Sequence, residues 1–96
     1  MLVSLGPSAL RDIASIGEYL IGESPQAADA FSQEIRKITE RLSTFPDSGS
    51  PIRGSIVRFV LLSGFEYKLF DRHVSRSELR IMRVRHGRRR PLRIET

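Results

Sequence analysis

The sequence predicts an α+β fold: an N-terminal α-helical hairpin packed on a small, mostly antiparallel β-sheet, in the order β-α-α-β-β-β. Two observations predict this class. Apolar residues recur at three- and four-residue spacing as far as residue 42, which is the period of amphipathic helices, and later alternate at a spacing of two, the period of strands. A loop rich in Pro, Ser and Gly, residues 45–51, separates the two regimes. A chain of 96 residues suits one domain, so residues 1–96 are assigned to a single unit.

The N-terminal part of the prediction begins with Met1–Leu5, a short apolar run that we expect to join the sheet as a brief strand. Gly6-Pro7 then begins the first helix, because proline suits the first helical position, where its missing N–H is not needed. The apolar face of this helix runs from Leu10 to Ile21 at helical spacing.

The second helix begins at Ser24-Pro25, where an N-cap residue is followed by proline, and its apolar face runs as far as Leu42. Only a short break separates the two helices, so the sequence predicts an antiparallel helical hairpin.

The C-terminal half of the chain predicts three strands joined by turns. The period of two and the turn residues between the runs indicate a meander. In chain order the segments are a strand at Ile56–Leu62, a two-residue connection at Ser63-Gly64, a strand at Phe65–Phe70 with an extension to Val74 left open, a turn at Ser75–Ser77, and a strand at Leu79–Arg85.

Composition limits the class of protein. The chain has no cysteine, which excludes disulfides and thiolate metal sites and fits a reducing compartment. No apolar run approaches the roughly 18–20 residues of a membrane span, and the N-terminus lacks the basic and long apolar regions of a signal peptide. We therefore expect a cytoplasmic protein without a membrane partner.

Charge is distributed unevenly along the chain. Residues 1–50 carry four basic and seven acidic side chains, whereas residues 51–96 carry twelve basic and four acidic ones. The C-terminal half therefore projects a positive field, which favours acidic partners: nucleic acid, an acidic peptide or a negative protein surface.

The stretch RIMRVRHGRRR, residues 80–90, holds six arginines. Alternation within its strand places Met82 and Val84 on one face, which we expect to pack on the helices. Ile81, Arg83 and Arg85 then share the opposite face. A face that is partly apolar and partly cationic is typical of a binding surface, although arginine stems can also cover an ordinary solvated face.

Catalytic and metal-binding patterns are sparse. With two histidines, His73 and His86, no cysteine and no ligand-like spacing, the sequence predicts no metal, and no glycine-rich phosphate loop predicts a cofactor. His86 lies among arginines that would disfavour its protonation and leave it available as a general base. The alternative, which we favour, is a strand-end histidine that bonds to the backbone or to a partner.

The positive charge of the C-terminal half is compatible with nucleic-acid binding, but the arginine-rich segment lacks the aromatic residues that usually accompany it. All seven aromatic residues precede residue 71, so the arginine-rich segment contains none on which bases could stack. Contact with backbone phosphates stays possible, but we do not favour it over a protein partner.

A set of residues spread over the whole chain forms a characteristic order: Pro7, Ala9, Asp12-Ile13, Ile16, Tyr19-Leu20, Ser24-Pro25, Ala27, Phe31, Ile35, Leu42, Pro46, Gly49, Arg58, Tyr67–Phe70 and Ile81–Arg89. The most distinctive part is the sequence around His86-Gly87 after the last strand. In these residues the chain resembles the ParE branch of the RelE/ParE toxin superfamily over essentially its full length.

The resemblance implies a bacterial type II toxin with the fold predicted above, neutralised by a cognate, ParD-like antitoxin whose C-terminal segment wraps the toxin. ParE-type members act on DNA gyrase, whereas RelE-type members cleave mRNA on the ribosome. This chain ends PLRIET, without the C-terminal tyrosine or histidine common in RelE-type toxins, and it has only two lysines, so gyrase inhibition is favoured.

The resemblance and the alternation together suggest three sets of site residues. We expect Ile81, Arg83 and Arg85 to bind the antitoxin. The target would be bound by the strand exit, His86, Arg88, Arg89 and Arg90. If the chain were instead an endoribonuclease, the catalytic set would be His86, Arg58, Arg83 and Arg89; otherwise no catalytic residue is assigned.

Overall fold

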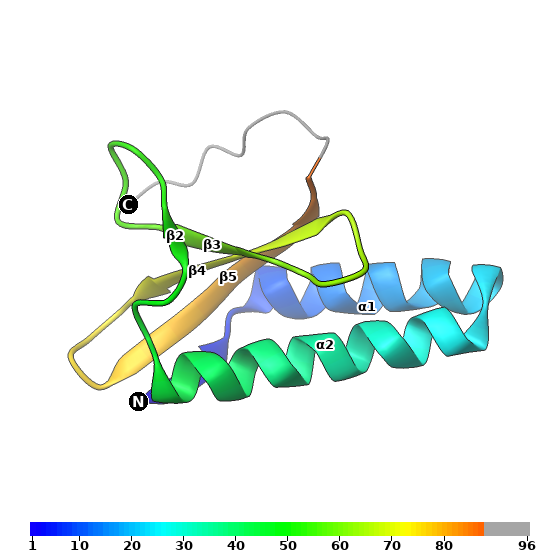
Figure 1. The fold of residues 1–96 in the computed structure, drawn as a ribbon, viewed down its shortest axis with the longest axis horizontal. Helices are drawn as coiled ribbons and strands as arrows, with labels where there is room; N and C mark the ends of the chain where they lie inside the picture. The colour runs from blue at the N-terminus through cyan, green and yellow to red at the C-terminus, as the bar shows by residue number, and fades with distance from the viewer. Residues whose placement is uncertain (88–96) are drawn as a thin grey trace.

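The computed structural model describes residues 1–87 and consists of a helical layer against one face of a five-stranded sheet (Figure 1). The α+β class and the helical hairpin are confirmed. The elements are β1 (Leu2–Leu5), α1 (Pro7–Glu23), α2 (Pro25–Thr44), β2 (Ser50–Pro51), β3 (Arg58–Leu61), β4 (Tyr67–His73) and β5 (Glu78–His86).

The two helices turn back on each other through a single residue, Ser24. Its backbone N–H donates to the carbonyl of Leu20 at 2.7 Å, which closes the last turn of α1. Its hydroxyl accepts a hydrogen bond from the N–H of Ala27 at 3.2 Å, which caps α2. Pro7 and Pro25 stand at the start of their helices, as their missing N–H groups favour.

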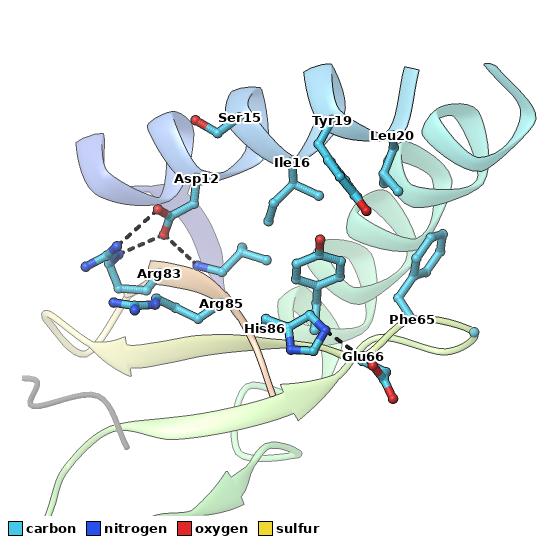
Figure 2. A pocket seen from close by; sticks show the side chains of 13 residues that line it. Asp12, Ser15, Ile16, Tyr19, Leu20, Phe65, Glu66, Arg83, Arg85 and His86 are labelled. Carbon is cyan, nitrogen blue, oxygen red and sulfur yellow. Dashed lines mark hydrogen bonds and ion pairs between the residues drawn. The ribbon is translucent and has the colours of Figure 1, made fainter. Parts of the chain in front are cut away.

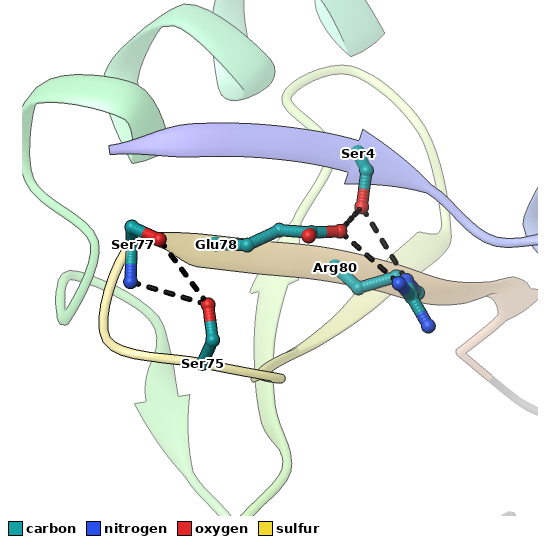
Figure 3. Close-up of polar contacts among 5 residues, drawn as sticks. All are labelled: Ser4, Ser75, Ser77, Glu78 and Arg80. Atoms are coloured by element: carbon teal, nitrogen blue, oxygen red, sulfur yellow. Dashed lines mark hydrogen bonds and ion pairs between the residues drawn. The ribbon is translucent and has the colours of Figure 1, made fainter.

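The sheet has the strand order β1-β5-β4-β3-β2. Three of the neighbouring pairs are antiparallel, and β1 runs parallel to β5, from Leu2 opposite Glu78 to Leu5 opposite Ile81. The first and last strands of the described chain therefore lie side by side (Figure 1). Ser4 ties them together, because its hydroxyl donates to the carboxylate of Glu78 at 2.6 Å, and Arg80 donates to the same carboxylate at 3.1 Å (Figure 3).

The hydrophobic core lies between the helices and the sheet. Phe31, Ile38 and Leu42 on α2 are almost fully buried, and Leu69 and Leu79 meet them from the sheet. Burying each of these side chains contributes about 1.5–3 kcal/mol relative to exposure. No helix in the described part of the chain is long and apolar enough to cross a membrane.

The last strand contains a β-bulge that changes which side chains face the helices. Phe70 pairs with Arg83, but the next residue, Asp71, pairs with Ile81, so Met82 is an extra residue on β5. Ile81 is consequently in the core with 0% exposure, and the prediction that placed it on the exposed face with the arginines is wrong. Val84 faces the core as predicted, whereas Met82 is only half-buried.

Two connections also differ from the sequence prediction. The β3–β4 connection is wider than the predicted two-residue turn, because the N–H of Leu62 donates to the carbonyl of Tyr67 and residues 63–66 form the loop. Gly64 adopts φ 81° there, a conformation that favours glycine. Ser50–Pro51, predicted as loop, forms a short edge strand, whereas the turn before β5 is confirmed by the hydrogen bond from Val74 N–H to Glu78.

Candidate partner-binding groove

An open groove with a volume of about 730 Å³ lies between α1 and the C-terminal end of β5 (Figure 2). We call it the α1–β5 groove. Helix α1 forms one wall, and β5 together with the β3–β4 loop forms the other. The lining residues are Asp12, Ser15, Ile16, Tyr19, Leu20, Gly64, Phe65, Glu66, Tyr67, Arg83, Val84, Arg85 and His86.

One end of the groove is held by Asp12. Strand β1 pairs with β5 only as far as Ile81, and beyond that point the carboxylate of Asp12 takes the place of a neighbouring strand. It accepts a hydrogen bond from the backbone N–H of Val84 at 3.0 Å and two from Arg83, at 2.7 and 3.1 Å (Figure 2). Asp12 therefore fixes α1 against the part of β5 that β1 does not cover.

The electrostatics of this contact are consistent with a permanent ion pair. Burial by itself raises the pKa of Asp12, but the hydrogen bonds from Arg83 and Val84 and the charges of Arg83 and Arg85 together outweigh it, so the pKa is lowered. The hydrogen bond to Asp12 likewise raises the pKa of Arg83. Arg83 was predicted to bind a partner, and in the structure it forms a two-pronged pair within the chain.

Arg85 differs from Arg83 although both line the groove. It is half-buried, and it makes no hydrogen bond or salt bridge with any residue in the range 1–87. Arg83 and Arg85 were predicted to share one face. Of the two, Arg85 can donate hydrogen bonds to a partner's carboxylate without first breaking an ion pair such as the one between Arg83 and Asp12.

The other end of the groove is aromatic. Tyr67 pairs with His86 across the sheet, and their rings meet edge-to-face with centroids 5.4 Å apart. Phe31 packs behind Tyr67 at 5.8 Å, and Tyr19 on α1 is 61% exposed (Figure 2). The Nε2 of His86 lies 3.3 Å from the carboxylate of Glu66, an acidic neighbour that the sequence argument about His86 did not include.

The structure does not bring the predicted endoribonuclease set together. Arg58 lies opposite Asp71 on β4, whereas His86 lies opposite Tyr67 on the same strand. Asp71 and Tyr67 are four positions apart, so Arg58 and His86 are separated by roughly 13 Å along β4. Its guanidinium donates to the carbonyls of Asp47 and Gly49, at 3.1 and 3.4 Å, outside the groove. The predicted target-binding arginines Arg88, Arg89 and Arg90 lie outside the described residues.

A second polar cluster lies under the α2–β2 loop, away from the groove. Asp71 is 0% exposed, and within the described chain neither of its carboxylate oxygens has a hydrogen-bond partner. Burial raises its pKa to about 6, although the charges of Arg58 and His73 act in the opposite direction. Asp47, whose carboxylate is 3.0 Å from His73, adds to the rise.

Residues 1–87 contain no group of three or more His, Cys, Asp and Glu side chains placed to hold a metal ion.

Comparison with known proteins identifies first the fold and then the family of this chain. The chain superposes on a solved structure described as the chromosomal ParDE TA system from P. aeruginosa with a TM-score of 0.73, at 22% identity, over 90% of this chain and 95% of that chain. The family model for the ParE toxin of the type II toxin-antitoxin system, parDE, matches residues 3–91. The chain therefore belongs to the ParE toxin family, as the sequence predicted. No curated protein sequence matches it.

Proposed function

We propose that this chain is a toxin that inhibits DNA gyrase in the bacterial cytoplasm and is neutralised by a cognate, ParD-like antitoxin. The observation that carries the proposal is the ParE family match over residues 3–91, which covers both helices and the five strands of the described chain except for Leu2.

The α1–β5 groove is the proposed antitoxin site. Its α1 wall includes the apolar side chains of Ile16 and Leu20, and Arg85 lines the groove as a cation without a salt bridge in the described chain. An antitoxin segment that places an apolar side chain on this wall and a carboxylate beside Arg85 would match both features. In this proposal Arg83 acts indirectly, by holding α1 in place through Asp12.

The proposed gyrase contact is the exit of β5, from His86 through Arg88, Arg89 and Arg90. It would meet an acidic surface of the target, because the C-terminal half of the chain carries twelve of its sixteen Lys and Arg residues.

A supercoiling assay with purified gyrase tests the proposal. The toxin should inhibit supercoiling or trap cleaved DNA, and the antitoxin should restore activity. A triple variant with Ala at positions 88, 89 and 90 should lose inhibition. The matched control replaces Arg36, Lys37 and Arg41, three exposed cations on α2, and should retain it. Normal gyrase activity in the presence of folded toxin would reject the proposal.

Ribosome-dependent mRNA cleavage is a second candidate because of the aromatic end of the groove. Tyr67 lies against His86, and Tyr19 is exposed beside them, so the fold supplies stacking residues that the arginine-rich segment lacks. If His86 were a general base, His86→Ala would lower cleavage by about 10²–10⁴-fold. A toxin that cleaves no mRNA on ribosomes, or a fully toxic His86→Ala variant, would eliminate this candidate.

A further inference from the structure

Helix α1 carries an exposed apolar face that the groove does not use. Leu10 is 52% exposed and Ile21 is 62% exposed, although both are large apolar side chains. Ala14, also exposed, and Gly17 lie between them at spacings of four, three and four residues. This is the spacing at which side chains form a continuous strip along one helix and meet a second helix. We call these four residues the α1 strip.

The α1 strip lies about half a turn of helix away from Asp12 and Tyr19, which line the α1–β5 groove, since successive residues are separated by roughly 100° around the axis. Figure 2 shows the groove side of α1, with Asp12, Ile16 and Tyr19 directed toward the sheet. A molecule bound to the α1 strip would therefore leave the groove open.

Gly17 is unexpected in the chain's own packing. Glycine in a helix interior destabilises the helix, because it adds conformational freedom to the unfolded chain. A Cβ added at Gly17 would meet nothing within 4 Å, so no neighbouring group in this structure requires the missing side chain. A glycine at the centre of the α1 strip does allow another helix to approach the backbone closely.

An antiparallel second copy of α1 would place residues of like size opposite one another. Alignment about the midpoint between Ala14 and Gly17 sets Leu10 against the partner's Ile21 at the two ends and Ala14 against the partner's Gly17 at the centre. The small central residues would let the two helix backbones approach closely, so that the large residues at the ends can pack on each other.

Charge favours the same alignment. Arg11 and Glu18 are exposed along one flank of the α1 strip, seven residues apart. In the antiparallel pair, Arg11 faces the partner's Glu18, and the two-fold axis forms this contact twice. Arg11 otherwise donates only to the hydroxyl of Ser8, at 3.2 Å, and Glu18 makes no hydrogen bond or salt bridge within the described residues.

We propose that the α1 strip joins two copies of this chain in an antiparallel, two-fold symmetric α1–α1 contact flanked by Arg11–Glu18 ion pairs. The occupant is a second copy because one helix supplies both the apolar strip with its small central residues and the complementary charges of Arg11 and Glu18. The contact is independent of the proposed gyrase inhibition and of the groove.

Sedimentation equilibrium of the full-length chain over a range of concentrations tests the proposal. The unmodified chain should form a dimer. Ile21→Lys and Arg11→Glu should each raise the dimer dissociation constant by about tenfold or more, since each removes complementary contacts twice. The double variant Arg11→Glu with Glu18→Arg should recover the original constant, because it reverses both charges of the pair.

Two glycine variants separate the contact from general effects on the helix. Gly17→Leu should abolish the dimer, whereas Gly22→Leu, on the same helix but off the α1 strip, should not. An added Cβ has open space at both positions, and circular dichroism would verify that both variants fold. The proposal is overturned if the unmodified chain is monomeric at all concentrations, or if the charge reversal fails to restore association. Loss of antitoxin binding in Ile21→Lys with a monomeric toxin would assign the face to the antitoxin instead.

Discussion

Asp71 provides a sharp test of the energetics of this fold, because a buried carboxylate without hydrogen-bond partners in the described chain destabilises the folded state when it ionises. Burial raises its pKa from the ordinary value of 3.8 to about 6. The difference, converted at 1.36 kcal/mol for each pKa unit, corresponds to about 3 kcal/mol of folding free energy. Since the folded pKa is the higher one, this stability is fully present below pH 3.8 and is lost as the pH rises through about 6.

The variant Asp71→Asn removes the titration and retains the shape. The amide introduces buried N–H groups that cost about 1–3 kcal/mol, but this cost does not change with pH. The free energy of unfolding, measured by urea denaturation from pH 4 to pH 8, should therefore fall with pH more steeply in the unmodified protein than in the variant. Asp29→Asn, at an exposed position on α2, should follow the unmodified protein. A constant difference between Asp71→Asn and the unmodified chain at every pH would refute the reasoning.

Three further substitutions address the groove and the loop. Asp12→Ala should lower the free energy of unfolding by about 1–3 kcal/mol, because it removes three hydrogen bonds, and in a double-mutant cycle with Arg83→Ala the two losses should not add. Arg85→Glu should weaken antitoxin binding by about tenfold or more in calorimetry, whereas Arg53→Glu, exposed in another loop, should leave binding unchanged. Gly49→Ala should destabilise by about 1–3 kcal/mol in thermal unfolding, since its Cβ would lie 3.0 Å from the Cβ of Arg58; an unchanged midpoint would mean that the loop shifts freely.

The helices were predictable because their signals are local. Pro7, Ser24 and Pro25 fix the starts of both helices by backbone chemistry that needs no tertiary context, and the structure has both boundaries where the sequence predicts them. The strands were located to within a few residues for a similar reason, since their period of two is also a local pattern.

The candidate site was less predictable because it depends on the bulge at Met82. One extra residue in β5 reverses the face of everything after it, and alternation alone carries no sign of it. The same extra residue sets Tyr67 opposite His86. A register counted from the turn at Ser75–Ser77 without a bulge would set Tyr67 opposite Arg85 instead. The partner of Arg83, Asp12, is 71 positions away, and no spacing rule connects them.

Because β1 pairs with β5, the sheet can be completed only late in the synthesis of the chain. The first strand of this chain has its place beside a strand that ends at His86, so the N-terminal residues have no sheet to join until nearly all of the 96 residues have been made. At about 5–20 residues per second, that delay lasts roughly 5–20 seconds for every molecule. A prematurely terminated chain would lack the groove and the strand exit as well as a complete sheet.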